Sequence, residues 1–243
     1  MKIMIIRHGD PDYVIDSLTE KGWREAAYLS ERLVKTPIKA FYVSPLGRAK
    51  DTIAPTLKKL NREAEECMWL REFDVHIHRP DVKDRMKVCW DWLPNDWTAE
   101  EKFFQHNHWM DPEVMADSDV PEQYQWVIEN FDRVLAKHGY VRENDYYRAA
   151  VPNSDTICFV CHFGLECVLL SRLLNISPMA LWHGMCAAPS SVTTLVTEER
   201  RPGIAYFRMG SFGDISHLYA NDEPPAFAAR FCELYTNMDE RHD

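Results

Sequence analysis

The chain has 243 residues, of which 46% are hydrophobic and 27% charged, and it carries a formal net charge of −10. These values are typical of a globular α/β domain, and the acidic balance argues against nucleic acid as a partner. No stretch approaches the roughly 20 apolar residues of a membrane span, and no signal peptide is visible, so we expect a cytoplasmic protein without membrane partners. The seven cysteines are scattered, which favours reduced thiols over disulfides.

Segments typical of strands alternate along the chain with segments typical of helices. Short apolar runs rich in β-branched residues predict strands over residues 2–7, 40–43, 67–70, 156–161, 191–197 and 204–209. Apolar residues at helical spacing predict helices over 19–35 with Thr19 as cap, 46–60, 120–138 with Asp119 as cap, 164–174 and 178–183, and a short one near Phe227. Residues 140–155 are expected to form a loop. This alternation predicts a three-layer α/β/α sandwich around a mostly parallel sheet.

Residues 75–118 differ from the rest of the chain. Four tryptophans, at positions 90, 92, 97 and 109, stand among many charges with poor periodicity. We interpret 75–118, here called the insertion, as a lid or cap carried within a single domain spanning 1–243. The alternative is a small satellite core without a functional role.

Three predicted strand ends carry unusual polar residues. The first strand ends in Arg7 and His8, Arg48 lies in the first turn of the helix after the second strand, and a later strand ends on His162. Parallel strands would bring these points to one edge of the sheet, where ligands bind in open α/β folds. Helix N-termini at that edge add free N–H groups. These residues predict an anion pocket that suits phosphate, because arginine can grip two phosphate oxygens at once.

The order and spacing of these motifs resemble the histidine phosphatase superfamily, also called phosphoglycerate-mutase-like. The resemblance covers most of the chain outside the insertion and rests on Arg7-His8-Gly9, Thr19-x-x-Gly22, Ser44-x-x-x-Arg48-Ala49-x-x-Thr52, His162-x-Gly164 and Ser216-His217-Leu218. It implies that His8 is the nucleophile and becomes phosphohistidine, for which it needs a neutral imidazole nitrogen. It also implies that Arg7, Arg48 and His162 hold the equatorial phosphate oxygens in the transition state.

The same resemblance implies a separate acid that protonates the departing alcohol. Glu72 matches the family's glutamate best, and Asp74 is the alternative. The acid phosphatase branch instead uses an aspartate directly after the second histidine, where this chain has Phe163. Asp10 replaces the glutamate of the common Arg-His-Gly-Glu pattern. The chain is similar here to a bacterial side branch of the family with the pattern Arg-His-Gly-Asp-Pro-x-Tyr, and this resemblance implies that Tyr13 lies near the pocket mouth.

Two histidine pairs, at 76 and 78 and at 106 and 108, lack partners at a typical zinc spacing, so we expect neither a metal nor another cofactor. We therefore predict a metal-independent phosphatase that hydrolyses a small phosphorylated metabolite through phosphohistidine. Two alternatives remain open: a phosphoglycerate-mutase-like phosphotransferase, which must keep water from the intermediate, and a non-catalytic phosphate-binding regulatory module.

Overall fold

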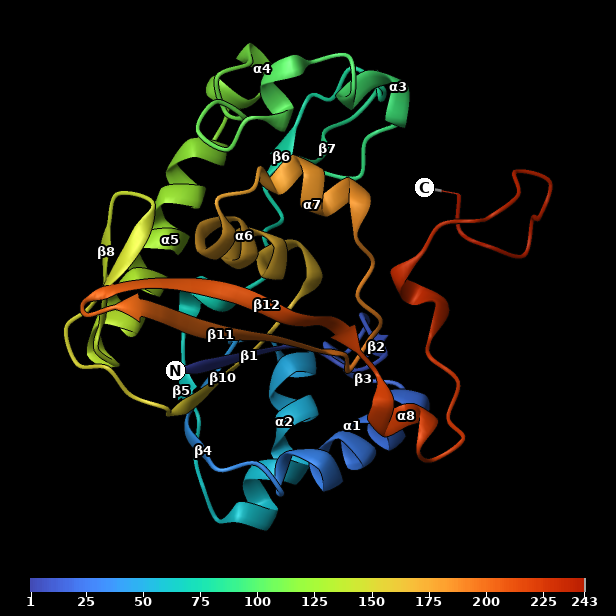
Figure 1. Cartoon of the computed structure of the whole chain (residues 1–243). Coiled ribbons are helices and arrows are strands. Elements are labelled where there is room, and N and C mark those ends of the chain that lie inside the picture. The colour runs from blue at the N-terminus through green and yellow to red at the C-terminus, as the bar shows by residue number, and fades with distance from the viewer. Residues whose placement is uncertain (243) are drawn as a thin grey trace.

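An eight-stranded mixed sheet forms the centre of the protein (Figure 1), and the computed structural model describes residues 1–242. In spatial order its strands are β5 (Glu65–Glu66), β4 (Ile38–Val43), β10 (Thr156–Cys161), β1 (Lys2–Arg7), β11 (Val192–Arg201), β12 (Ile204–Asp214), β9 (Tyr146–Ala149) and β8 (Tyr140–Glu143). Strand β1 runs parallel to β10 and antiparallel to β11. Strands β4 and β5 extend the parallel part. The carboxyl ends of β1, β4 and β10 therefore lie at one edge.

Helices cover both faces of the sheet, which gives the three-layer α/β/α arrangement that the sequence predicts. The main helices are α1 (Glu20–Leu33), α2 (Gly47–Leu60), α5 (Val120–Lys137), α6 (Phe163–Leu174), α7 (Pro178–Gly184) and α8 (Ser216–Tyr219). Figure 1 shows α1 and α2 on one face and α5 and α6 on the other. Along β1, Ile3 and Ile5 join the core on the α5–α6 side, whereas Met4 and Ile6 join the core on the α1–α2 side. Successive side chains of β1 thus point to opposite faces, as the geometry of a strand requires, and both of these faces are buried.

The insertion shares its core with the rest of the protein. Its short elements are β6 (His76–Ile77), β7 (Lys87–Val88), α3 (Pro94–Trp97), η2 (Glu101–Phe104) and α4 (Glu113–Ala116). The short elements outside the insertion are β2 (Pro11–Asp12), β3 (Ser17–Leu18), η1 (Met68–Leu70) and η3 (Phe227–Ala229). Trp109 is fully buried and packs edge-on against Trp182 of α7, with ring centroids 5.5 Å apart. The Ser177 hydroxyl donates to the carbonyl of Phe103 at 2.5 Å. The insertion is therefore anchored to α7.

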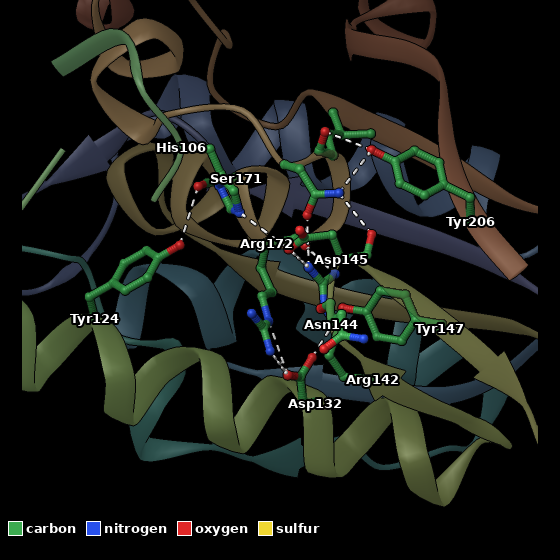
Figure 2. A network of polar contacts seen from close by, with 12 residues as sticks. His106, Tyr124, Asp132, Arg142, Asn144, Asp145, Tyr147, Ser171, Arg172 and Tyr206 are labelled. Atoms are coloured by element: carbon green, nitrogen blue, oxygen red, sulfur yellow. Dashed lines mark hydrogen bonds and ion pairs between the residues drawn. The ribbon is translucent and has the colours of Figure 1, made fainter. Parts of the chain in front are cut away.

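The segment 140–155 is not the expected loop, because β8 and β9 form a hairpin there. Asn144 begins its tight turn in the left-handed conformation, with φ of 49°, which asparagine tolerates. Figure 2 shows the polar network that holds the hairpin in place: the Tyr147 hydroxyl donates to Asp132 of α5 at 3.0 Å, and Arg142 donates to the carbonyl of Arg172 of α6 at 2.8 Å. These contacts between distant segments give the hairpin its stability.

The prediction of a strand over residues 67–70 is also wrong. The strand β5 ends at Glu66, and the 3₁₀ turn η1 occupies residues 68–70. The 3₁₀ turn brings Trp69 into the core, where its ring lies 6.1 Å from that of Phe159. Burial of this indole outweighs the pairing that a longer edge strand would gain.

Two smaller expectations need correction. Asp119 precedes α5, but its side chain makes no capping hydrogen bond; the Ser118 hydroxyl instead accepts from the N–H of Val120 at 3.2 Å. The short helix expected near Phe227 is only the 3₁₀ turn η3. Within residues 1–242, no helix is both long and apolar enough to cross a bilayer.

Candidate active site

The three strand ends singled out in the sequence meet at one edge of the sheet. His8 follows β1 and His162 follows β10, and their ring centroids lie 5.1 Å apart. Ser44 follows β4, and its hydroxyl is 2.7 Å from Nε2 of His162. All three residues are buried, with exposed fractions of 2% or less. The parallel part of the sheet therefore builds the centre of the candidate site.

His8 is held in one tautomer. Its Nδ1 lies 2.8 Å from the carbonyl oxygen of Gly9, which can only accept, so Nδ1 carries the proton and Nε2 keeps its lone pair. Burial lowers the pKa of His8 well below its usual value, and Arg7 adds to this effect, while the Gly9 carbonyl opposes it. The N–H of Gly9 donates to Thr52 of α2 at 2.8 Å, which fixes the turn. His8 is therefore a neutral imidazole at neutral pH.

Arg7 and Arg48 bring positive charge to the two histidines. Arg7 donates to the carbonyl of Ala187 at 2.6 Å, and its guanidinium lies 5.8 Å from the ring centroid of Phe163. Arg48 donates to Asp16 at 2.6 Å. The buried Nε atom of each arginine has no hydrogen-bond partner among the described residues. Each arginine thus keeps a donor that an anion could use.

His162 resembles His8 in its burial and charge. Burial lowers the pKa of its imidazole well below the usual value, and His8, Arg48 and Arg7 lower it further. Its Nδ1 is buried and unpartnered in the described part of the chain. When the Ser44 hydroxyl donates to Nε2, this Nδ1 carries the proton and becomes a further donor.

Glu72 reaches the same edge from the loop after η1. Its Oε1 accepts from the N–H of Phe73 at 2.8 Å and from the N–H of Leu165, in the first turn of α6, at 2.9 Å. Burial raises the pKa of the carboxyl group above its usual value, although these two N–H groups and Arg7 oppose the shift. Gly164 permits the approach, because a Cβ there would lie 2.7 Å from Oε1. A carboxylic acid with a raised pKa is suited to giving up a proton at neutral pH.

Two further candidates differ in their placement. The Tyr13 ring lies 5.3 Å from the Arg48 guanidinium, so Tyr13 borders the site although it is largely exposed. Asp74 is exposed and lies 3.8 Å from Arg71. No contact joins Asp74 to either site histidine within residues 1–242. Those residues also contain no group of three His, Cys, Asp or Glu side chains placed to hold a metal ion.

Sequence reasoning missed several residues that support the site. Asp16 accepts from both Arg48 and the N–H of Gly47, at 2.6 and 2.7 Å, and adopts a φ of 48°. Aspartate in a turn tolerates this conformation, but the sequence does not indicate which arginine it would meet. Trp90 of the insertion lies against Gly164, and its indole N–H donates to the carbonyl of Phe73 at 2.7 Å. No periodic pattern links it to the site.

The fold and this cluster define the class of an α/β enzyme that acts on phosphate groups. A scan against models of protein families matches residues 3–209 to the histidine phosphatase superfamily, branch 1. The chain belongs to this superfamily, as its motifs predict, and it is a phosphatase of the histidine type. A search of the curated proteins found no match.

Solved structures share the fold. A phosphoserine phosphatase mutant from Entamoeba histolytica, in complex with phosphoserine, is 18% identical with a TM-score of 0.58, covering 89% of this chain and 98% of that one. The mycobacterial glucosyl-3-phosphoglycerate phosphatase in complex with VO3 is 19% identical, with a TM-score of 0.53 and coverage of 87% and 98%. The alpha-ribazole phosphatase from Shigella flexneri is 17% identical, with a TM-score of 0.51 and coverage of 86% and 95%.

Proposed function

We propose that this phosphatase hydrolyses a small phosphorylated metabolite, without a metal, through a phosphohistidine at His8. The observation that carries the proposal is the hydrogen bond between Nδ1 of His8 and the Gly9 carbonyl. This bond leaves the Nε2 lone pair free, and burial keeps the ring neutral. A buried imidazole with a free lone pair beside two arginines is suited to attack a phosphoryl group.

In the first step, Nε2 of His8 forms a bond to phosphorus while the bond from phosphorus to the ester oxygen breaks. Negative charge spreads over the three equatorial oxygens in the transition state. Arg7, Arg48 and His162 supply donors to these oxygens, and their unpartnered buried nitrogens support this role. The protonated carboxyl of Glu72 gives its proton to the departing oxygen, so the product leaves as an alcohol.

In the second step, the oxygen of a water molecule forms a bond to the phosphorus of phosphohistidine while the bond from phosphorus to Nε2 of His8 breaks. The Glu72 carboxylate accepts a proton from that water, inorganic phosphate leaves, and neutral His8 and protonated Glu72 are restored. Asp74 is the weaker candidate for the acid because it is exposed and lies beside Arg71. Tyr13, which packs on Arg48, is proposed to line the mouth of the pocket.

The substrate class rests on the related structures. Phosphoserine and 3-phosphoglyceric acid occupy the Entamoeba histolytica phosphoserine phosphatase structures. Both ligands are small and carry one phosphate with further polar groups. We infer that this protein takes a substrate of similar size, and that the insertion (75–118) acts as a lid or cap that borders its leaving group.

The nucleophile is tested with 4-nitrophenyl phosphate in the presence of a chelator. His8→Ala is expected to lower kcat by at least about 10³-fold, because the variant lacks the imidazole that forms the covalent intermediate. His108→Ala is the matched control, since His108 is an exposed histidine whose Nδ1 lies 2.8 Å from the Asp111 carboxylate. Activity that survives in His8→Ala would refute the nucleophile. Phosphate binding without any hydrolysis by the wild type would instead favour a regulatory module, and strong transfer between hydroxyls of a phosphoglycerate would favour a mutase.

The acid is tested by comparing two leaving groups. Glu72→Gln keeps the shape of the side chain but has no proton to transfer. We expect kcat on glycerol 2-phosphate, an alkyl ester, to fall about 10²- to 10⁴-fold. Hydrolysis of 4-nitrophenyl phosphate is expected to change far less, because nitrophenolate leaves without protonation. An equal loss on both substrates would count against Glu72 as the acid, and the same pattern in Asp74→Asn would move the role to Asp74.

A further inference from the structure

Trp90 of the insertion contacts the loop that carries the proposed acid. Its Nε1 donates to the carbonyl of Phe73 at 2.7 Å, one residue after Glu72. Two of its ring carbons lie 2.8 and 2.9 Å from the point where a Cβ at residue 164 would stand, and that point is 2.7 Å from Oε1 of Glu72. Trp90, Gly164 and the Glu72 carboxyl group therefore occupy one small volume.

The backbone of Trp90 is itself fixed by a buried ion pair. Arg79 donates to the carbonyl of Trp90 at 2.5 Å and pairs with Asp81 at 2.7 Å. The side chains of Arg79 and Asp81 are only 7% and 2% exposed. Buried, charge-assisted hydrogen bonds of this kind are strong and directional. The backbone that carries the indole is thus held by contacts outside the loop that the indole meets.

Both polar groups of Phe73 are engaged, one on each side. Its N–H donates to Oε1 of Glu72 at 2.8 Å, while its carbonyl accepts from Trp90. The N–H of Leu165 donates to the same Oε1 at 2.9 Å. With Oε1 held by two donors, Oε2 is the oxygen left to carry the transferable proton. The carbonyl and the N–H of Phe73 belong to the two peptide units that meet at the Phe73 Cα. A shift of the carbonyl would pass through this Cα to the Glu72–Phe73 peptide, and it would move the Glu72 carboxyl group with it.

We propose that Trp90 is a positioning residue for Glu72: its indole N–H holds the carbonyl of Phe73, and with it the backbone next to Glu72, so that the acid faces the leaving group. This inference rests on the proposed role of Glu72. It assigns to the insertion a specific part in the reaction, which is to set the geometry of proton transfer and not to touch the phosphate. The geometry matters because misplacement by about 1 Å can cost on the order of 10²-fold in rate.

The test uses Trp90→Phe, which removes the N–H donor and keeps an aromatic ring. The ratio of kcat on glycerol 2-phosphate to kcat on 4-nitrophenyl phosphate is expected to fall about 10-fold or more. Both substrates are assayed on one preparation, so the ratio does not depend on the folded fraction. Trp92→Phe is the matched control: Trp92 also donates its indole N–H to a carbonyl, but to that of Cys89 at 3.0 Å, within the insertion and outside the loop that carries Glu72. We expect its ratio to equal that of the wild type.

The outcomes separate this inference from the proposed function. If Glu72→Gln lowers the ratio and Trp90→Phe does not, the positioning role is refuted while the acid stands. If neither variant lowers the ratio, the acid role of Glu72 and the positioning role of Trp90 are both refuted. A drop of the same size in Trp92→Phe would show a general loss of packing and would also overturn the inference. The double variant Glu72→Gln with Trp90→Phe is expected to lose no more than Glu72→Gln alone, because both changes act through one proton transfer.

Discussion

Replacement of Gly164 by alanine tests how tightly the acid is packed. In the native helix α6, the added methyl group would lie 2.7 Å from Oε1 of Glu72 and 2.8 Å from the Trp90 ring, both closer than atoms can approach. Overpacking of this kind costs about 1–3 kcal/mol. Loss of an acceptor for the Leu165 N–H costs about 1–3 kcal/mol more, whereas alanine in place of glycine in a helix returns about 1 kcal/mol.

The sum is a loss of about 3 kcal/mol in the free energy of unfolding. For a chain of this length, that loss corresponds to a fall of about 6–12 °C in Tm. Urea denaturation and calorimetry measure the two quantities. Gly184→Ala in α7 is the control, since a Cβ at that position meets nothing within 4 Å. Gly164→Ala with wild-type stability and an unchanged ratio of alkyl to aryl phosphate hydrolysis would refute the reasoning about this contact.

Three further predictions follow from the charges. Asp16→Asn removes the ion pair that orients Arg48, so KM for 4-nitrophenyl phosphate should rise about 5-fold, as expected for about 1 kcal/mol; a lower KM would mean that Asp16 competes with phosphate. The rate of glycerol 2-phosphate hydrolysis should fall as the pH rises through the raised pKa of Glu72. The rate on 4-nitrophenyl phosphate, measured over the same pH range, should not show this fall. Burial lowers the pKa of His217 to about 4, so its share of stability is complete above about pH 6.5 and is lost as the pH falls toward 4. Between pH 7.5 and 5, urea titrations should show that His217→Gln loses about 2 kcal/mol less free energy of unfolding than the wild type. An equal loss in the two proteins would contradict the lowered pKa. The comparison needs the variant because buried carboxyl groups with raised pKa values change the stability in the opposite direction over this pH range.

The elements that position the site could be predicted because their signals are local. Strands β1 and β10 match the predicted residues throughout, since a run buried on both faces is apolar at every position. The helix α1 begins after Thr19, whose side chain accepts from the N–H of Gly22 as the sequence indicates. Arg7, His8 and His162 occupy strand ends, so a parallel sheet brings them together without further information.

The remaining contacts depend on residues far apart in the chain. Trp90 meets Gly164 across more than seventy positions, and the poor periodicity around it gives no sign of the neighbour it packs against. The hairpin β8–β9 carries no regular alternation in its first strand, and its edge position is secured by Asp132 and Arg172 from two helices. Such tertiary contacts override local secondary-structure preference, and they leave no local pattern in a single sequence from which they could be predicted.

The packing of Trp109 against Trp182 has a consequence for turnover. Both indoles are almost fully buried, and each one buries about 150–250 Å². Trp182 also packs on Phe73, outside the insertion, so lifting the insertion away from α7 would chiefly expose the ring of Trp109, at a cost of about 4–6 kcal/mol. Only about one molecule in 10³ or fewer would be open at any instant. The insertion should therefore act as a fixed cap and not as a moving lid, and kcat should not be limited by a hinge.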